Sequence, residues 1–279
     1  MALNSLTKKL FRALTRVIPQ CNMISQAVAF NMFLAFFPLL IIAMGLLSSS
    51  LQGKNGPDLV AQLAAILPPG SWQLVSELLL RHQMNTFPWV FLGWGGTLLV
   101  GSQVMKLIME GIHLIYGDPE RPSFFGRQFR GMLLFCVTIV AWLGAVVLSV
   151  FSYPLFHWLT PGWLTPGFGQ SPWVRGFWNI MLPVGGLILE MVVLAVIYRF
   201  ARLNATSWRS VFPGAGAATI LWWGLTVLFG IYVRKMQFGL VYGTLAAVIG
   251  LMVWMEFSAM IVFFGAAWNA EGAPPASRL

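Results

Sequence analysis

The sequence predicts an all-α, polytopic membrane protein with six transmembrane helices and with both termini in the cytoplasm. Three observations lead to this fold class. Of the 279 residues, 58% are hydrophobic and only 9% are charged, whereas soluble domains average about 25% charged residues. The apolar residues form six runs, each of the roughly 20 residues that a helix needs to cross the hydrocarbon. Lys and Arg gather in alternate connections between these runs.

The six predicted spans are apolar on all sides, unlike the alternating strands of a membrane barrel. The first run begins late and is too long for the hydrophobic region of a secretory signal, so no cleavable signal is expected. The predicted spans are Ala27–Leu51, Phe87–Leu107, Gly131–Phe156, Trp178–Ile197, Val211–Val233 and Leu240–Trp268.

The distribution of basic residues predicts the orientation. The N-terminal arm, the second and fourth connections and the C-terminal tail together hold eleven Lys and Arg, and the other side holds five. Because basic residues are enriched on the cytoplasmic side of membrane proteins, both termini are expected there. The net charge of +9 is therefore attributed to topology, and no nucleic-acid partner is expected.

The regions outside the spans have patterns of their own. Residues 1–26 place apolar side chains at helical spacing with Lys and Arg between them, which predicts an amphipathic arm on an anionic inner leaflet. Residues 27–270 are expected to form one membrane domain. Within its first outer connection, residues 58–82 predict two short interfacial helices. Residues 271–279 are expected to form a cytoplasmic tail.

A stripe of polar side chains marks the second span. Ser102, Gln103, Lys106, Glu110 and His113 fall on one face about 100° wide at helical periodicity. Lys106 and Glu110 are four residues apart and can pair. Two interpretations stay open. The stripe lies at the membrane edge, where a lysine extends outward, or it lines a water-filled vestibule open to the cytoplasm.

Small residues and prolines predict helix packing. Gly93, Thr97 and Gly101 lie on nearly the opposite face of the second span, where they would let another helix approach closely. Pro38 predicts a kink in the first span. Gly239 and Gly243, which open the sixth span, are interpreted as a packing contact.

Glu190 lies in the middle of the fourth span, on the same face as Pro183 and Gly186. Pro183 would free a backbone carbonyl and Gly186 would admit a neighbouring helix. Interrupted helices at mid-membrane mark substrate sites in many transporters. The alternative is a protonated Glu190 that bonds to a neighbouring helix, because burial favours the neutral carboxyl group.

Glu256 is the single acid in the apolar stretch Gly250–Gly265. A charged acid at mid-bilayer costs at least roughly 2.5–3.5 kcal/mol, so such residues usually face a cavity or a partner. Glu256 is therefore expected to face the protein interior. Its candidate partners are Lys106, His113 and Asn31. A structural hydrogen bond and a proton-linked role in transport both remain open.

Several short motifs resemble those of the YihY/BrkB family of bacterial inner-membrane proteins, over nearly the whole chain. The chain departs from the family's Gly-Ala-Glu near the end of the sixth helix, because Gly265, Ala266 and Ala267 stand there. The resemblance implies six transmembrane helices in the bacterial cytoplasmic membrane and suggests transport of lipid or small solutes. The matching motifs are Phe37-Pro38, Ile197–Phe200, Trp208, Pro213-Gly214-Ala215, Tyr242-Gly243 and Trp254.

The sequence thus predicts a transporter or exporter of lipid or of a small amphipathic or anionic solute. The alternative is a scaffold or envelope-assembly factor that transports nothing. The expected partners are membrane lipids and an anionic lipid or small solute. Asp118 and Glu120 are interpreted as part of a solvated charged turn. The eight acids are scattered and form no motif, so no enzyme, catalytic residue, metal or cofactor is expected.

Overall fold

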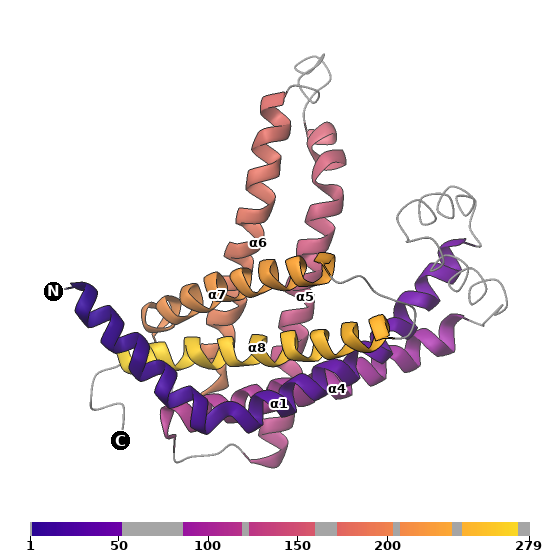
Figure 1. Cartoon of the computed structure of the whole chain (residues 1–279). Helices are drawn as coiled ribbons and strands as arrows, with labels where there is room; N and C mark the ends of the chain where they lie inside the picture. The colour runs from indigo at the N-terminus through magenta and orange to yellow at the C-terminus, as the bar shows by residue number, and fades with distance from the viewer. Residues whose placement is uncertain are drawn as a thin grey trace. The chain divides into compact units, whose positions relative to one another are not determined.

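The computed structural model describes residues 2–51, 86–118, 123–159, 172–202, 207–235 and 242–272. Within these ranges the chain is helical and contains no strand (Figure 1). The predicted all-α class is confirmed. The helices are α1 (Ala2–Leu51), α4 (Thr86–Tyr116), α5 (Phe124–Leu159), α6 (Pro172–Ala201), α7 (Trp208–Lys235) and α8 (Tyr242–Gly272).

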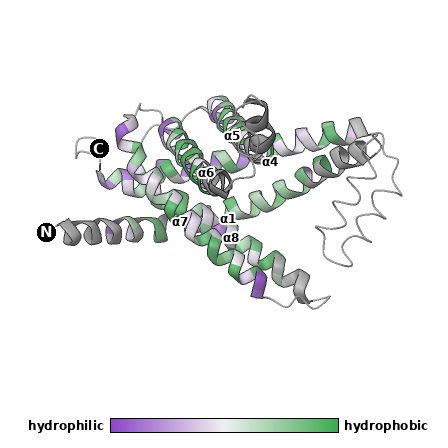
Figure 2. Cartoon of the chain, turned by 90° about the horizontal axis from the view of Figure 1, so that it is seen from above, coloured by the Kyte–Doolittle hydropathy of each residue, from purple (hydrophilic) through white to green (hydrophobic). Residues whose placement is uncertain are grey.

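Each of the six described helices contains a segment long and apolar enough to cross a membrane, which confirms the predicted number of spans. Figure 2 shows hydrophobic residues along much of their described length. The orientation of the termini remains a prediction. The segments that meet this criterion are Cys21–Leu39, Val90–Tyr116, Phe124–Gly144, Pro183–Ala201, Trp208–Lys235 and Val248–Gly272.

The predicted arm and the first span form one continuous helix. Helix α1 has 50 residues, which corresponds to about 75 Å at 1.5 Å per residue, far more than the hydrocarbon thickness of about 30 Å. Arg12, in the arm, lies 3.6 Å from Glu271 near the end of α8. The predicted interfacial helices at residues 58–82 and most of the predicted tail lie outside the described residues.

The chain divides into two compact units, residues 30–101 and residues 1–29 with 102–279. In the first unit, Gly93 of α4 lies against α1. A Cβ atom added at Gly93 would come within 2.7 Å of the Ile42 side chain and 3.0 Å of the Pro38 carbonyl oxygen. Thr97 is also buried. Gly93, the first residue of the predicted small-residue stripe, thus faces α1.

In the second unit, α5, α6, α7 and α8 contact one another in series, and α7 runs alongside α8 (Figure 1). Three helices meet where Tyr198 of α6, Gly214 of α7 and Gly265 of α8 lie together, and we call this the α6–α7–α8 junction. The Tyr198 hydroxyl donates to the Val262 carbonyl at 2.8 Å. A Cβ atom at Gly265 would lie 2.7 Å from the Gly214 carbonyl oxygen. The backbones of α7 and α8 approach closely because both residues lack a side chain.

Asn269 bonds to the backbone of α7 beside this junction. Its Oδ1 atom accepts from the Gly214 N–H at 2.7 Å, and its Nδ2 atom donates to the Val211 carbonyl at 3.0 Å. Pro213, inside α7, has no N–H and interrupts the helical hydrogen bonds at this point. The buried amide of Asn269 therefore bonds to the α7 backbone on both sides of Pro213. Sequence motifs far apart along the chain are in this way brought into one packing contact.

Candidate functional site

The end of α4 places Asp118 beside His113. Gly117 adopts the left-handed conformation (φ 67°), which glycine accepts without steric penalty. The Asp118 N–H donates to the His113 carbonyl and the Gly117 N–H donates to the Leu114 carbonyl, both at 3.2 Å. This is the Schellman pattern that ends many helices. As a result the Asp118 Oδ2 atom lies 3.3 Å from His113 Nδ1.

Arg202, just after α6, binds the same carboxylate. Its Nε atom donates to Asp118 Oδ2 at 2.9 Å and its Nη2 atom donates to Oδ1 at 2.7 Å. The Arg202 guanidinium carbon also lies 3.9 Å from the centroid of the Tyr116 ring, a cation–π distance. The side chains of Arg202 and Asp118 are only 6% and 11% exposed. We call His113, Tyr116, Asp118 and Arg202 the charge cluster.

The charge cluster corrects the expectation of a solvated turn at Asp118. Burial by itself would raise the pKa of Asp118, but the hydrogen bonds and charge of Arg202, with a further contribution from His113, hold it below its ordinary value. Burial would likewise lower the pKa of Arg202, and the bonds to Asp118 raise it instead. Both groups are therefore charged, and the sequence missed the pair because 84 positions separate its members.

The polar stripe of α4 meets the start of α5. The Lys106 Nζ atom donates to Gln128 Oε1 at 2.7 Å, and Glu110 lies 4.0 Å from Arg127. Gln103 is exposed. The Ser123 hydroxyl, which accepts from the Gly126 N–H at 3.2 Å, caps the N-terminus of α5 and orients its first turn. The stripe therefore contacts polar side chains of the neighbouring helix.

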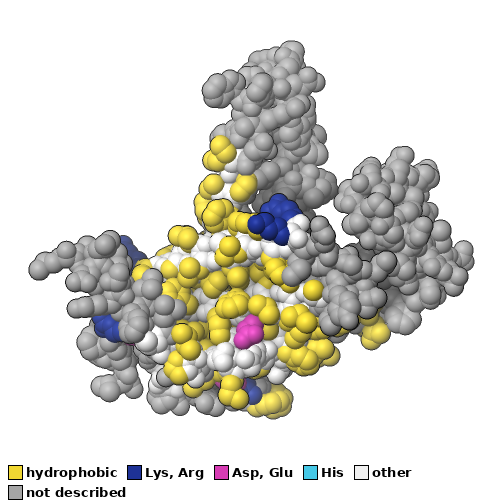
Figure 3. Space-filling model, viewed as in Figure 1, with side chains coloured by type: hydrophobic (Ala, Val, Ile, Leu, Met, Phe, Trp, Pro, Cys, Tyr) yellow, Lys and Arg dark blue, Asp and Glu magenta, His cyan; other side chains and the backbone are white. Residues whose placement is uncertain are grey.

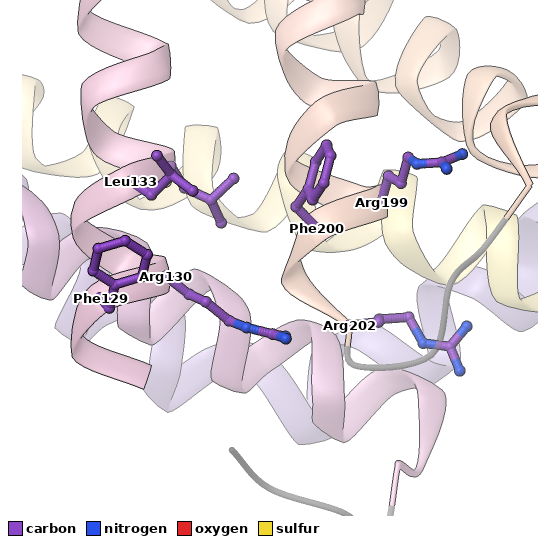
Figure 4. Close-up of a pocket in the computed structure, with 7 residues that line it drawn as sticks. Phe129, Arg130, Leu133, Arg199, Phe200 and Arg202 are labelled. Carbon is purple, nitrogen blue, oxygen red and sulfur yellow. The ribbon is translucent and has the colours of Figure 1, made fainter. Parts of the chain in front are cut away.

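A pocket of about 370 Å³ lies between the start of α5 and the end of α6 (Figure 4). Its walls combine apolar side chains with three arginines. In Figure 4, Arg130 extends from α5 toward α6, whereas the guanidinium groups of Arg199 and Arg202 point away from α5. We call this the α5–α6 pocket. Its lining residues are Phe129, Arg130, Leu133, Leu134, Arg199, Phe200 and Arg202.

Glu256 lies at the border between the two faces of α8. Met255 and Ala259 are buried, Val253 and Phe257 are exposed, and Glu256 is half-buried. Figure 3 shows an acidic side chain framed by hydrophobic ones over the middle of α8. Among the described residues, the Glu256 carboxylate has no hydrogen bond or ion pair. The expected interior position is thus only partly met, because one helical step of 100° turns position 256 away from the buried face.

Two of the suggested partners of Glu256 bond to other residues. Lys106 bonds to Gln128 and His113 bonds to Asp118. His113 Nε2 is buried without a hydrogen-bond partner among the described residues. Asn31 is half-buried in the unit formed by residues 30–101.

Glu190 is half-buried in α6, and Pro183 and Gly186 of the same helix are exposed. A Cβ atom added at Gly186 would meet no atom within 4 Å. The expectation that Gly186 admits a neighbouring helix is therefore not met within the described residues. Gly239 lies outside the described residues, and the surroundings of Gly243 are likewise not described. The predicted packing contact at these two glycines stays a prediction.

The motif residues of α6 divide between packing and the α5–α6 pocket. Tyr198 enters the α6–α7–α8 junction, whereas Arg199 and Phe200 line the pocket. The Arg199 guanidinium carbon lies 4.4 Å from the centroid of the Trp208 ring. Sequence reasoning found these residues as a motif but did not assign Arg130, Arg199 or Arg202 to a site. Their common signal was the clustering of arginines at the ends of two spans.

Six apolar helices with ionic groups gathered near helix ends define a multi-pass helical membrane protein. The chain belongs to the BrkB virulence-factor family, which it matches over residues 19–276. This match confirms the resemblance to the YihY/BrkB proteins. No solved structure matches the chain.

Curated relatives cover most of the chain. It is 27% identical over 252 residues to the ribonuclease-like protein YfkH of Bacillus subtilis (strain 168), with 88% of each chain covered. It is 24% identical over 272 residues to a UPF0761 membrane protein of Xanthomonas oryzae pv. oryzae (strain PXO99A), which covers 91% of this chain and 59% of that protein. It is 20% identical to a UPF0761 membrane protein of Nitrosospira multiformis, of which 56% is covered. The chain thus spans somewhat more than half the length of these UPF0761 relatives.

Proposed function

We propose that this protein is a transporter or exporter of a lipid or of a small amphipathic, anionic solute in the bacterial cytoplasmic membrane. The observation that carries the proposal is Glu256, a half-buried acid in the middle of an apolar span that has no partner among the described residues. Such a group costs at least roughly 2.5–3.5 kcal/mol if it is charged within the hydrocarbon. An ionisable residue retained at that depth is best explained by a water-accessible pathway or by exchange of a proton.

The basic ends of the helices support the choice of an anionic substrate. Arg130, Arg199 and Arg202 line one pocket at the ends of two spans. Positive charge at a membrane surface attracts anionic headgroups and other anions. Glu190 provides a second half-buried acid within a span.

The test is flux in proteoliposomes that contain a fluorescent phosphatidylglycerol or a small anionic dye. We expect Glu256→Gln to lower the flux at least about tenfold, as expected when a proton-transfer group is lost, with the yield and thermal stability of the parent. Glu271→Gln makes the same chemical change at the end of the same helix and is expected to retain the flux. Equal flux in the parent and in Glu256→Gln would remove the acid from the mechanism.

A scaffold role without transport is the alternative, and one observation favours it. The motif residues Tyr198 and Gly214 meet Gly265 in a packing contact. A scaffold predicts that the parent protein moves neither probe under any imposed gradient. It also predicts that Glu256→Gln changes nothing except stability.

A further inference from the structure

The α5–α6 pocket holds a cation that is available to a ligand. Arg202 is bound by Asp118 through two hydrogen bonds, and Arg199 lies over the Trp208 ring. Within the described part of the chain, Arg130 has no hydrogen bond, ion pair or ring contact. Its side chain extends across the space between the two helices (Figure 4). An anion bound there would therefore displace no partner that Arg130 has in the described ranges.

The charge around the pocket favours an anion. Asp118 offsets the charge of Arg202, and Arg130 adds its positive charge to the same pocket. The Glu110 carboxylate lies 4.0 Å from the Arg127 guanidinium group. A guanidinium group presents a planar fork of N–H donors that matches the oxygens of a phosphate. The pocket is thus suited to a phosphate group in particular.

The apolar walls indicate that the phosphate belongs to a lipid. Phe129, Leu133 and Phe200 line the pocket and are exposed, and exposed Val137 and Val140 continue the apolar surface along α5. A small soluble anion would not remove this apolar surface from water, whereas acyl chains would cover it.

The position of the pocket along the helices agrees with this assignment. It lies at the start of the span Phe124–Gly144 and at the end of the span Pro183–Ala201, where headgroups meet the hydrocarbon. Basic pockets between transmembrane helices on the cytoplasmic side bind anionic headgroups in other proteins. The volume of about 370 Å³ is that of a small-ligand site, enough for a headgroup but not for whole acyl chains.

We propose that the α5–α6 pocket binds an anionic phospholipid, with Arg130 as the ligand of the phosphate and with the acyl chains lying along Phe129, Leu133 and Phe200. This binding site does not depend on the proposed transport activity. A scaffold would contain it equally, and a transporter that moved another solute would still hold this lipid.

The experiment compares lipid retention by the full-length protein in detergent, measured by native mass spectrometry. The probes are a phosphatidylglycerol and a phosphatidylcholine with identical chains. We expect the phosphatidylglycerol to bind more tightly and Arg130→Gln to weaken it about tenfold, the usual loss for a charge-assisted hydrogen bond. Arg209→Gln removes the same charge from an exposed position of α7 outside the pocket, and should bind like the parent. Equal retention of the two lipids, or equal losses in the two variants, would overturn the proposal.

Two further measurements keep the test decisive. Arg130→Lys retains the charge but not the planar fork, so its affinity should fall between those of the parent and Arg130→Gln. It carries the test if Arg130→Gln fails to fold. Inorganic phosphate is then added as a competitor of the bound phosphatidylglycerol. We expect it to compete only at concentrations far above that of the lipid, whereas displacement at an equal concentration would assign the pocket to a soluble anion and contradict a lipid site.

Discussion

The Arg202 guanidinium holds the Asp118 carboxylate with two hydrogen bonds, Nε to Oδ2 at 2.9 Å and Nη2 to Oδ1 at 2.7 Å. This pair ties the end of α4 to the end of α6. Because both side chains are nearly buried, neither charge can be left alone without a large penalty. The same Arg202 lines the α5–α6 pocket, so the pair also fixes one wall of the proposed lipid site.

Removal of one member of this pair should destabilise the protein. We expect Asp118→Asn and Arg202→Gln each to lower the free energy of unfolding by about 3 kcal/mol, because each leaves a buried charge without its partner. The double variant should be less destabilised than the sum of the two single variants. Chemical unfolding in detergent measures all three, with Arg209→Gln as the control for loss of an exposed arginine. Strict additivity would contradict the pairing.

The pKa of Asp118 predicts a dependence of stability on pH. Since the folded pKa lies below the ordinary value, the unfolded state takes up the proton first, and the contribution of Asp118 to stability is fully present only above its unfolded pKa of about 3.9. The stability advantage of the parent over Asp118→Asn should therefore be constant above about pH 5 and should shrink as the pH falls below about 4. Unfolding measured at a series of pH values checks this. A difference that stayed constant down to pH 3 would show that folding does not lower the pKa of Asp118.

Gly265 should not tolerate a side chain. An alanine Cβ atom there would lie 2.7 Å from the Gly214 carbonyl oxygen and 2.9 Å from Ala218 Cβ. We expect Gly265→Ala to destabilise the protein by about 1–3 kcal/mol through overpacking. Gly224→Ala is the matched control, because a Cβ at Gly224 of α7 meets nothing within 4 Å and alanine favours a helix by about 1 kcal/mol. Thermal unfolding of both variants should move in opposite directions.

Loss of the Asn269 side-chain amide should destabilise the protein. Asn269→Ala would remove the two hydrogen bonds that its amide makes in a buried place, from the Gly214 N–H and to the Val211 carbonyl. A hydrogen bond contributes about 0.5–1.5 kcal/mol, so a loss of about 1–3 kcal/mol is expected for the two bonds. Asn22→Ala, at an exposed position of α1, should have little effect. Hydrogen exchange of the Gly214 amide, measured in the parent and in Asn269→Ala, should be faster in the variant.

The helices were predictable because each depends on a local property. A run of apolar residues near the length of a span is sufficient to predict a helix, and Val211–Val233 lies within α7 almost end to end. The common face of the small residues of α4 was also predictable, since helical periodicity alone places Gly93 and Thr97 on one side of the helix. The surroundings of Gly186 could not be predicted in the same way, because a small residue can also lie at an open surface, and in the described ranges no atom lies within 4 Å of a Cβ added there.

The contacts between side chains were not predictable. The spacing of Lys106 and Glu110 allowed a pair within one helix, whereas Lys106 bonds to Gln128 of the next helix. Asp118 was interpreted as solvated because its partner comes from another helix, 84 positions away. No local pattern distinguishes a solvated acid in a turn from one that a distant arginine binds.

By itself the sequence determined that this protein is a six-span helical membrane protein of the BrkB family, because the length of an apolar run and a short motif are both properties of consecutive residues. Only the tertiary structure decided which charges pair, that Tyr198, Gly214 and Gly265 share one packing contact, and that Arg130 and Phe200 line one pocket. The physical reason is that side-chain contacts depend on how helices approach and turn toward one another, and apolarity alone does not specify those angles.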